Sequence, residues 1–344
     1  MSEQPKIVGG LFGLEPVAPG AQQKRPYFLR EDDLLLVNAR SALSLVLNHL
    51  HPRLVWWPAF MCPETIHTVK YQGEARYYER GSDRWMSLAH RGDVVVVLDE
   101  FGFPNQHAGR LDKMRSRGVI IVEDACQAML SAHVGEEADY VIFSPRKFIG
   151  VADGGILRTV TGVPLDLPEL PSPSARWLGM AREAAERRAK FDRGSEDEGW
   201  FNLFQRVELA QPCGAYAMSN LSRSILFSIT DWSEIIRRRR DNYSLLLQRL
   251  KEYALHPQLP PGVVPLGFPV VVENRDEVRQ KLFAEKIYPP VHWQLAGHVP
   301  AEFAVAHRLS KHVMTLPCDQ RYDSAVIQRM AEIVRLKGRP CKAT

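Results

Sequence analysis

The stretches VIIVEDACQA, residues 119–128, and YVIFSPRKFIGVADGGIL, residues 140–157, decide the fold of this chain. In each, an apolar run ends in polar residues: Asp124 follows the first run, and Ser144 and Lys147 follow the second. Continuous apolar runs of this kind are typical of strands buried on both faces. Since an open parallel sheet binds ligands beyond the carboxyl ends of its strands, we expect these polar side chains to meet at one site.

The same alternation of short apolar runs with amphipathic helical stretches extends from about residue 34 to 160. It predicts an α/β fold with a mostly parallel sheet flanked by helices. From about residue 161 to 200, a proline-rich stretch and then a charged one predict a loop and an exposed helix. Strand and helix patterns after a long helical region at 219–253 predict a smaller C-terminal α+β domain. We therefore expect a large, ligand-binding domain at 1–240 and a small domain at 241–344.

Charge and cysteine content exclude several classes of protein. The net charge of +4, from 44 basic and 40 acidic residues, offers no strong field for nucleic acid or a membrane surface. Four consecutive arginines at 237–240 lie in a helical pattern, and we interpret them as a solvated helix face. Five cysteines show neither metal-ligand spacing nor the density of a disulfide scaffold, so we expect no metal site and a reducing cytoplasm. No apolar run approaches membrane-spanning length.

Four features of the sequence have ordinary explanations when taken singly. Arg40 and Ser41 open a helix, where a serine is usually a cap; Asp124 is equally consistent with a buried acceptor; Lys147 is consistent with a surface lysine. The Asp-Gly-Gly turn at 153–155 is consistent with a simple connection. Together they match pyridoxal phosphate, which needs a lysine for a Schiff base, an acid for the ring nitrogen and a phosphate cradle. A lysine bonded to that cofactor is no longer a free ammonium, so its burial is tolerated.

At these residues the sequence resembles the DegT/DnrJ/StrS-type sugar aminotransferases, a branch of the fold type I pyridoxal phosphate enzymes. The segment VEDACQA is similar to the family's E-D-x-x-Q, and FSPRKFIGVADGGIL is similar to its S-x-x-K followed by a glycine pair. The segment NARSAL is similar to the family's S-G-T-x-A-L phosphate loop. The resemblance covers most of the chain and is weakest from about 161 to 212.

The resemblance implies roles for particular residues. It makes Lys147 the Schiff-base and proton-transfer lysine, Asp124 the partner of the pyridinium, and Gln127 the neighbour of the ring hydroxyl. The phosphate would be bound by Ser144, Arg40 and Ser41. Family members that dehydrate sugars carry histidine in place of this lysine, so Lys147 favours transamination.

Other positions depart from the family or leave alternatives open. The family places an aromatic residue over the cofactor ring, and here the matching position is Cys62, with Phe60 close by. The stretch CGAYAMSNL, 213–221, lacks the asparagine and arginine of the family's G-x-N-x-R-M pattern, which reach the partner subunit's site. His292 and Trp293 resemble a segment facing the substrate, although a structural role for the histidine is equally consistent. His107 is interpreted as structural.

The leading hypothesis is an aminotransferase that moves an amino group from glutamate to a nucleotide-linked keto sugar, in polysaccharide or amino-sugar biosynthesis. The expected assembly is a cytoplasmic homodimer. One alternative keeps the fold and the cofactor but makes the protein a catalytically degenerate regulator or scaffold. Another is a plain nucleotide-binding α/β protein with an incidental lysine.

Overall fold

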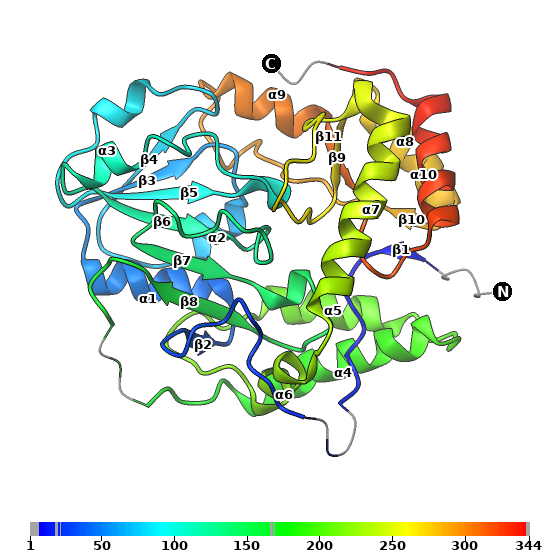
Figure 1. The fold of residues 1–344 in the computed structure, drawn as a ribbon, viewed down its shortest axis with the longest axis horizontal. Coiled ribbons are helices and arrows are strands. Elements are labelled where there is room, and N and C mark those ends of the chain that lie inside the picture. The colour runs from blue at the N-terminus through cyan, green and yellow to red at the C-terminus, as the bar shows by residue number, and fades with distance from the viewer. Residues whose placement is uncertain (1–6, 18–19, 21, 166, 168, 342–344) are drawn as a thin grey trace.

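The computed structural model describes residues 7–17, 20, 22–165, 167 and 169–341. Its centre is a seven-stranded sheet (Figure 1). The strand order is β2 (Leu34–Leu36), β8 (Gly155–Thr159), β7 (Tyr140–Phe143), β6 (Ile120–Asp124), β5 (Val94–Leu98), β3 (Leu54–Pro58) and β4 (Glu74–Tyr78). Strand β8 runs antiparallel to both of its neighbours, and the other pairings are parallel. The prediction of a mostly parallel sheet is confirmed.

Both faces of the central strands are buried, which explains their continuous apolar sequence. Every residue of β5 is buried, and alternate residues belong to different cores. Val95 and Val97 pack on one side of the sheet, whereas Val94 and Val96 pack on the other. This alternation is the two-residue period of a strand applied to a sheet covered on both sides.

Helices cover the two faces of the sheet. Helix α1 (Ala39–Leu50) packs its buried stripe on the Val94 side, together with the segment of α2 (Pro63–Thr68). Helix α6 (Asn220–Ser228) packs on the Val95 side, with α3 (Asp112–Arg115). Within the stretch 107–118, only the four residues of α3 are α-helical.

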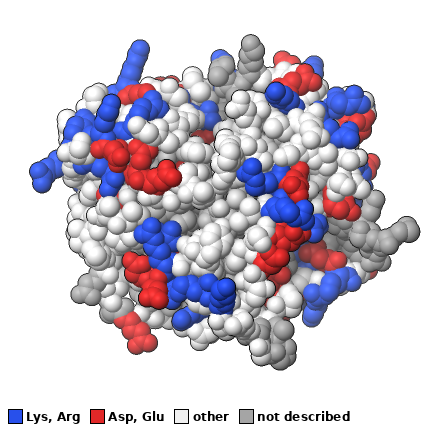
Figure 2. Space-filling model, viewed as in Figure 1, with Lys and Arg blue, Asp and Glu red and all other residues white. Residues whose placement is uncertain are grey.

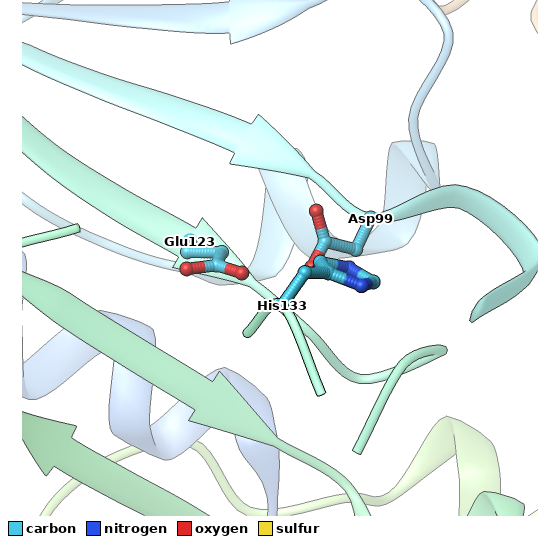
Figure 3. A group of neighbouring side chains, drawn as sticks. All are labelled: Asp99, Glu123 and His133. Atoms are coloured by element: carbon cyan, nitrogen blue, oxygen red, sulfur yellow. The ribbon is translucent and has the colours of Figure 1, made fainter. Parts of the chain in front are cut away.

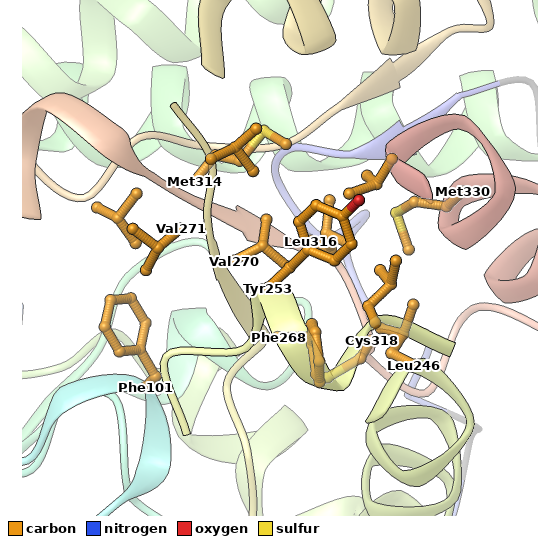
Figure 4. Close-up of a cluster of buried hydrophobic side chains, with 14 of the residues drawn as sticks. Phe101, Leu246, Tyr253, Phe268, Val270, Val271, Met314, Leu316, Cys318 and Met330 are labelled. Atoms are coloured by element: carbon orange, nitrogen blue, oxygen red, sulfur yellow. The ribbon is translucent and has the colours of Figure 1, made fainter. Parts of the chain in front are cut away.

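The C-terminal part forms a smaller α+β unit, as predicted. It contains α7 (Trp232–Leu250), β9 (Phe268–Val271), α8 (Arg275–Ala284), β10 (Ile287–Tyr288), α9 (Ala304–His312), β11 (Val313–Leu316) and α10 (Ser324–Lys337). Strands β9 and β11 pair antiparallel beneath a core of large apolar side chains (Figure 4). The N-terminal strand β1 (Val8–Gly9) pairs in parallel with β10. The division into 1–240 and 241–344 stays a prediction, and residue 240 lies within α7.

The expected exposed helix is instead packed, because one stripe of it is apolar. Helix α4 (Ala175–Asp192) buries Trp177 and alanines at helical spacing, and it packs along α5 (Gly199–Leu209). Its Arg188 is 1% exposed, donates to the Gly9 carbonyl at 3.2 Å and lies over the Trp200 ring. The charged residues of this stretch therefore include a buried arginine, Arg188, whose burial the composition does not predict.

The arginine run at 237–240 is only partly a solvated face, which corrects the interpretation made from the sequence. Arg237 is exposed and pairs with Glu234 and Asp241 on the same helix. Arg239, two residues later, is 0% exposed. Figure 2 shows basic and acidic side chains interspersed on one face of the molecule, with both signs along α7. Among the described residues, none of the helices is long and apolar enough to cross a membrane.

Candidate active site

A cavity of about 1070 Å³ opens beyond the carboxyl ends of β5, β6 and β7. Leu98, Asp124 and Ile142, which end or nearly end these strands, line its floor. Segments from both parts of the chain complete the wall, including 7–12, α5 and the stretch 289–293. The parallel strands thus bring the predicted polar residues to one place, as expected of an open α/β sheet.

Asp124 and Lys147 both line this cavity. Asp124 is the last residue of β6, is 7% exposed, and accepts a hydrogen bond from the Cys126 backbone N–H at 3.0 Å. Lys147 ends a 3₁₀ turn, Pro145–Lys147, that follows β7, and its N–H bonds the Ser144 carbonyl at 3.2 Å. Its side chain is half-buried. Ser144 precedes the turn in extended conformation and also lines the cavity.

The N-terminus of α1 forms another part of the wall. Asn38 caps the helix by accepting from the Ser41 N–H at 2.8 Å, and Asn38, Ala39 and Arg40 line the cavity. Gly155 permits this placement, because a Cβ there would lie 2.1 Å from the Asn38 carbonyl carbon. Free N–H groups at a helix N-terminus suit an anion such as a phosphate.

Ser41 is the one predicted site residue that does not line the cavity. It is fully buried, and its hydroxyl accepts from the Gly214 N–H at 3.2 Å. The residues that do face the cavity, Asn38 to Arg40, directly precede Ser41 in the chain. A role for Ser41 at the phosphate stays a prediction, and its observed contact ties α1 to the segment at 213–221.

Gln127 offers a test of whether the site fits pyridoxal phosphate. Its Oε1 accepts from the Phe101 N–H at 2.7 Å, whereas its Nε2 is buried without a hydrogen-bond partner among the described residues. A buried donor without an acceptor costs free energy unless a ligand satisfies it. The hydroxyl oxygen of the cofactor ring is such an acceptor, so Gln127, Asp124, Lys147 and the α1 N-terminus fit the group.

The structure distinguishes the two residues considered for stacking on the ring. Cys62 lines the cavity, whereas Phe60 is 1% exposed and packs against Trp293 with ring centroids 5.2 Å apart. The Cys62 thiol donates to Glu64 at 3.1 Å. Burial raises the pKa of this thiol, and the charge of Lys147 acts in the opposite direction. Cys62 is thus a neutral thiol near the lysine.

His292 and Trp293 also reach the cavity. His292 Nδ1 lies 2.7 Å from the Thr315 hydroxyl. Burial, together with the charge of Lys147, lowers the pKa of His292 to about 3. A neutral imidazole therefore faces the site at physiological pH. His107 does not line this cavity; it is buried beside Asp83, at 3.0 Å.

Sequence reasoning missed the wall formed by α5. Glu208 of this helix bonds Arg146 and lies 4.0 Å from Arg40, and Gln211 accepts from Arg40 at 2.9 Å. Trp200 and several neighbours line the same side. The available signal was the helical spacing of aromatic residues between 200 and 204. That signal predicts an amphipathic helix but not which site it covers.

A second polar group lies on the opposite face of the sheet from Asp124. Glu123, its neighbour in β6, points toward Asp99 and His133 (Figure 3). His133 Nε2 lies 3.1 Å from Asp99, and Glu123 accepts from the Gly135 N–H at 2.8 Å. Burial raises the pKa of Asp99 to about 6 and that of Glu123 well above its usual value. The ligand atoms are close enough for a metal ion, but they also satisfy one another.

The Asp-Gly-Gly turn at 153–155 is more than a simple connection. Asp153 is fully buried and accepts from the Ser219 N–H at 2.8 Å and from the Ser219 and Ser222 hydroxyls at 2.5 Å. Ser219 also caps α6. Ser219, within the stretch 213–221, and Ser222, just beyond it, therefore anchor the turn after Lys147.

Comparisons with known proteins agree with this geometry. A search of curated protein sequences returns no match. Among solved structures, a putative sugar aminotransferase from Streptococcus pneumoniae, Spr1654 in its PLP form, is similar with a TM-score of 0.63, 16% identity and coverage of 88% of this chain and 86% of that one. DesV from S. venezuelae, solved with a ketimine intermediate, has a TM-score of 0.62, 17% identity and coverage of 91% and 85%.

A third solved structure, DesI in the presence of its TDP-sugar product, has a TM-score of 0.60 and 19% identity, and covers 88% of this chain and 80% of that one. At these identities the structural likeness shows the fold alone. The family model of the DegT/DnrJ/EryC1/StrS aminotransferases matches residues 89–335, which is well over half of the chain. The chain is therefore a member of the DegT/DnrJ/EryC1/StrS aminotransferase family, with the fold type I architecture and pyridoxal phosphate as its cofactor.

Proposed function

We propose that this aminotransferase moves an amino group from glutamate to a keto sugar carried on a nucleotide. The observation that supports the proposal best is the meeting of Asp124, Gln127, Lys147 and the α1 N-terminus at one cavity. The cavity, at about 1070 Å³, is at the upper end of the usual range for ligand sites, so it has room for a substrate beside the cofactor. DesI, of the same fold, was solved in the presence of a TDP-sugar product.

Each residue has a distinct task in this proposal. Pyridoxal phosphate, when bound, supplies an electron-accepting ring. The Asp124 carboxylate holds a proton on the ring nitrogen through a charge-assisted hydrogen bond. Gln127 Nε2 donates to the ring hydroxyl oxygen, and the N–H groups at Ala39 and Arg40 bind the phosphate, assisted by Ser144.

Lys147 Nζ would hold the cofactor until the substrate amine displaces it, and the freed amine would then carry a proton between the substrate carbon that bears the nitrogen and the cofactor carbon bonded to that nitrogen. Cys62, which lines the cavity, would lie beside the cofactor ring at the position where the family has an aromatic residue. His292 and Trp293 contact the substrate. Because His292 is neutral and its Nδ1 faces Thr315, its Nε2 can donate or accept a hydrogen bond according to the tautomer, which suits a sugar hydroxyl.

The decisive experiment separates the two half-reactions. The protein is loaded with pyridoxal phosphate and mixed with glutamate, and 2-oxoglutarate is measured as the visible absorption band of the cofactor changes. Nucleotide-linked keto sugars are then added, and amino sugar is measured by mass spectrometry. If glutamate, glutamine and other common amino acids all leave the band unchanged in the loaded protein, the regulatory or scaffold role becomes the better explanation.

The homodimer and the cytoplasmic location are part of the proposal. Symmetric dimers are the commonest oligomers of soluble proteins, and an exposed apolar residue such as Leu209, the last of α5, offers contact area. Light scattering at micromolar concentration tests the dimer, and a monomeric mass contradicts it.

A further inference from the structure

The arginine run of α7 has no part in the proposed function, yet most of it binds backbone carbonyls. Arg238 donates to the Tyr322 carbonyl at 3.2 Å, and Arg240 donates to the Pro260 carbonyl at 3.0 Å. Arg239, between them, donates to the Pro265 and Leu266 carbonyls at 3.1 and 3.2 Å. Three consecutive arginines thus fasten loops of the C-terminal part to α7.

Arg239 reaches further than its neighbours, into the turn that carries Lys147. It is 0% exposed, and its Nη2 donates to the Phe148 carbonyl at 3.5 Å. Its guanidinium lies 4.6 Å from the centre of the Phe148 ring. None of the ion pairs among the described residues includes Arg239. Its guanidinium instead contacts backbone carbonyls, the amide of Gln320 and the rings of two phenylalanines. A buried cation held in this way is costly unless its partners are fixed.

Phe148 is the residue directly after Lys147, and it is held from several directions. It is fully buried, and its N–H donates to the Pro145 carbonyl at 2.8 Å, closing the turn. Its carbonyl also accepts from Gln320 Nε2 at 2.6 Å. The Gln320 Oε1 in turn accepts from Arg239 Nε at 2.9 Å. Arg239 and Gln320 therefore form one hydrogen-bonded unit that holds the carbonyl next to the lysine.

We propose that Arg239 and Gln320 are positioning residues that hold the turn 145–148 so that Lys147 Nζ meets the cofactor. Neither residue is expected to touch the reacting atoms. The lysine reaches the cofactor from a turn of only three residues, so a shift of its backbone displaces Nζ directly. Misplacement by about 1 Å can cost a hundredfold in rate. The proposal rests on the proposed function of Lys147 as the lysine that binds the cofactor.

Two variants test it, with a matched control on the same helix. Gln320→Glu keeps an acceptor for Arg239 but removes the donor to the Phe148 carbonyl. Arg239→Lys keeps the charge but loses the planar guanidinium, whose several N–H groups donate to Gln320 and to Phe148 at the same time. Arg237→Lys is the control, since Arg237 is exposed and pairs only with residues of its own helix. The measurements are the rate at which the apoprotein captures pyridoxal phosphate, the pH midpoint of the visible band of the loaded protein, and the thermal unfolding of the apoprotein.

We expect both test variants to capture pyridoxal phosphate about tenfold more slowly or worse, and to shift the pH midpoint, while the control matches the parent. Gln320→Glu should unfold within a few degrees of the parent. Unchanged capture and an unchanged midpoint in Gln320→Glu overturn the proposal, even if Arg239→Lys fails to fold. A lower unfolding temperature with an unmoved midpoint also overturns it, because that result indicates a structural role alone.

Borohydride reduction and peptide mapping of the parent protein distinguish failure of this inference from failure of the proposed function. Capture of the cofactor at a lysine other than Lys147 overturns both. Capture at Lys147 with the expected loss in the variants, but without transamination of any amino acid, supports the positioning role and contradicts only the proposed reaction.

Discussion

Two parts of the cavity wall differ in origin. One is made of strand ends, where Asp124 ends β6 and the turn with Lys147 follows β7. The other is made of α5 and the N-terminal segment around Gly10, which reach the same space from distant parts of the chain. The first wall carries the chemistry and has a local sequence signature. The second part shapes the cavity but has no local sequence signature of a site, because only tertiary packing brings its residues to the cavity.

The largest effect that this contrast predicts is at Lys147. We expect Lys147→Ala to lower the transamination rate by at least about ten-thousandfold, because the variant loses both the covalent attachment and the proton carrier. Turnover of glutamate measures it, and Lys113→Ala, an exposed lysine on α3, is the control. A variant that retains a tenth of the activity would remove Lys147 from the proposed mechanism.

Asp124 belongs to the same wall, and its loss should be next in size. Asp124→Ala should reduce the rate about a thousandfold, or about 4 kcal/mol in barrier height, since the ring nitrogen loses the carboxylate that holds its proton. Circular dichroism should show a folded protein, because the Asp124 carboxylate accepts only one hydrogen bond, from the Cys126 N–H, among the described residues. Full turnover in the folded variant contradicts the assignment and leaves the carboxylate a structural role.

The second wall should respond in stability rather than in chemistry. Trp200 is 5% exposed and packs against Arg188 and Phe191. Trp200→Ala should lower the free energy of unfolding by about 3 kcal/mol, as for large aromatic residues in a core. The neighbouring Phe201, 49% exposed, is the control, and Phe201→Ala should cost less than about 1 kcal/mol. Equal losses in the two variants would show that α5 does not pack as described.

The sequence predicted the strand-end wall because each of its signals is local. An apolar run gives a buried strand, and the polar residue that follows it lies at the strand's carboxyl end. The order of strands in the sheet then decides which of these ends meet, and that order is a property of the fold type. The sequence therefore predicts that Asp124 and Lys147 lie at one site, and both line the same cavity.

Burial of charged residues was the main feature that the sequence did not reveal. Arg188 and Arg239 lie in highly charged stretches that read as solvent-exposed helices. Each is buried because aromatic rings and backbone carbonyls from distant segments surround its guanidinium. The composition of a short stretch of sequence gives no information about partners that lie far along the chain. Similarly, the contact of Ser41 with Gly214 could not be predicted, because it depends on a segment far along the chain.

The smallest predicted effect concerns the face of the sheet opposite Asp124, and it appears as a dependence of stability on pH. The fold raises the pKa of Asp99 to about 6, mainly by burial, so the folded protein binds this proton more tightly than the unfolded chain does. This contribution to stability is present below about pH 4, the unfolded value, and is lost as the pH rises to about 6. His133 acts in the opposite sense, since burial lowers its pKa and its contribution is lost as the pH falls below about 6.5.

An asparagine is neutral at every pH. The variant Asp99→Asn should therefore lack the loss of stability that Asp99 causes in the parent as the pH rises. The free energy of unfolding is measured with urea at pH 4.5 and at pH 6.5. Between these two values, as the pH rises, the free energy of unfolding of the parent should fall by about 1–3 kcal/mol more than that of the variant. Asp112→Asn, at an exposed position on α3, should behave like the parent. The same pH difference in Asp99→Asn and the parent would mean that the Asp99 carboxyl is already ionised in the fold at pH 4.5. In that case the group with Glu123 and His133 would be an ion-paired cluster beside the strand that carries Asp124, rather than one that shares a proton.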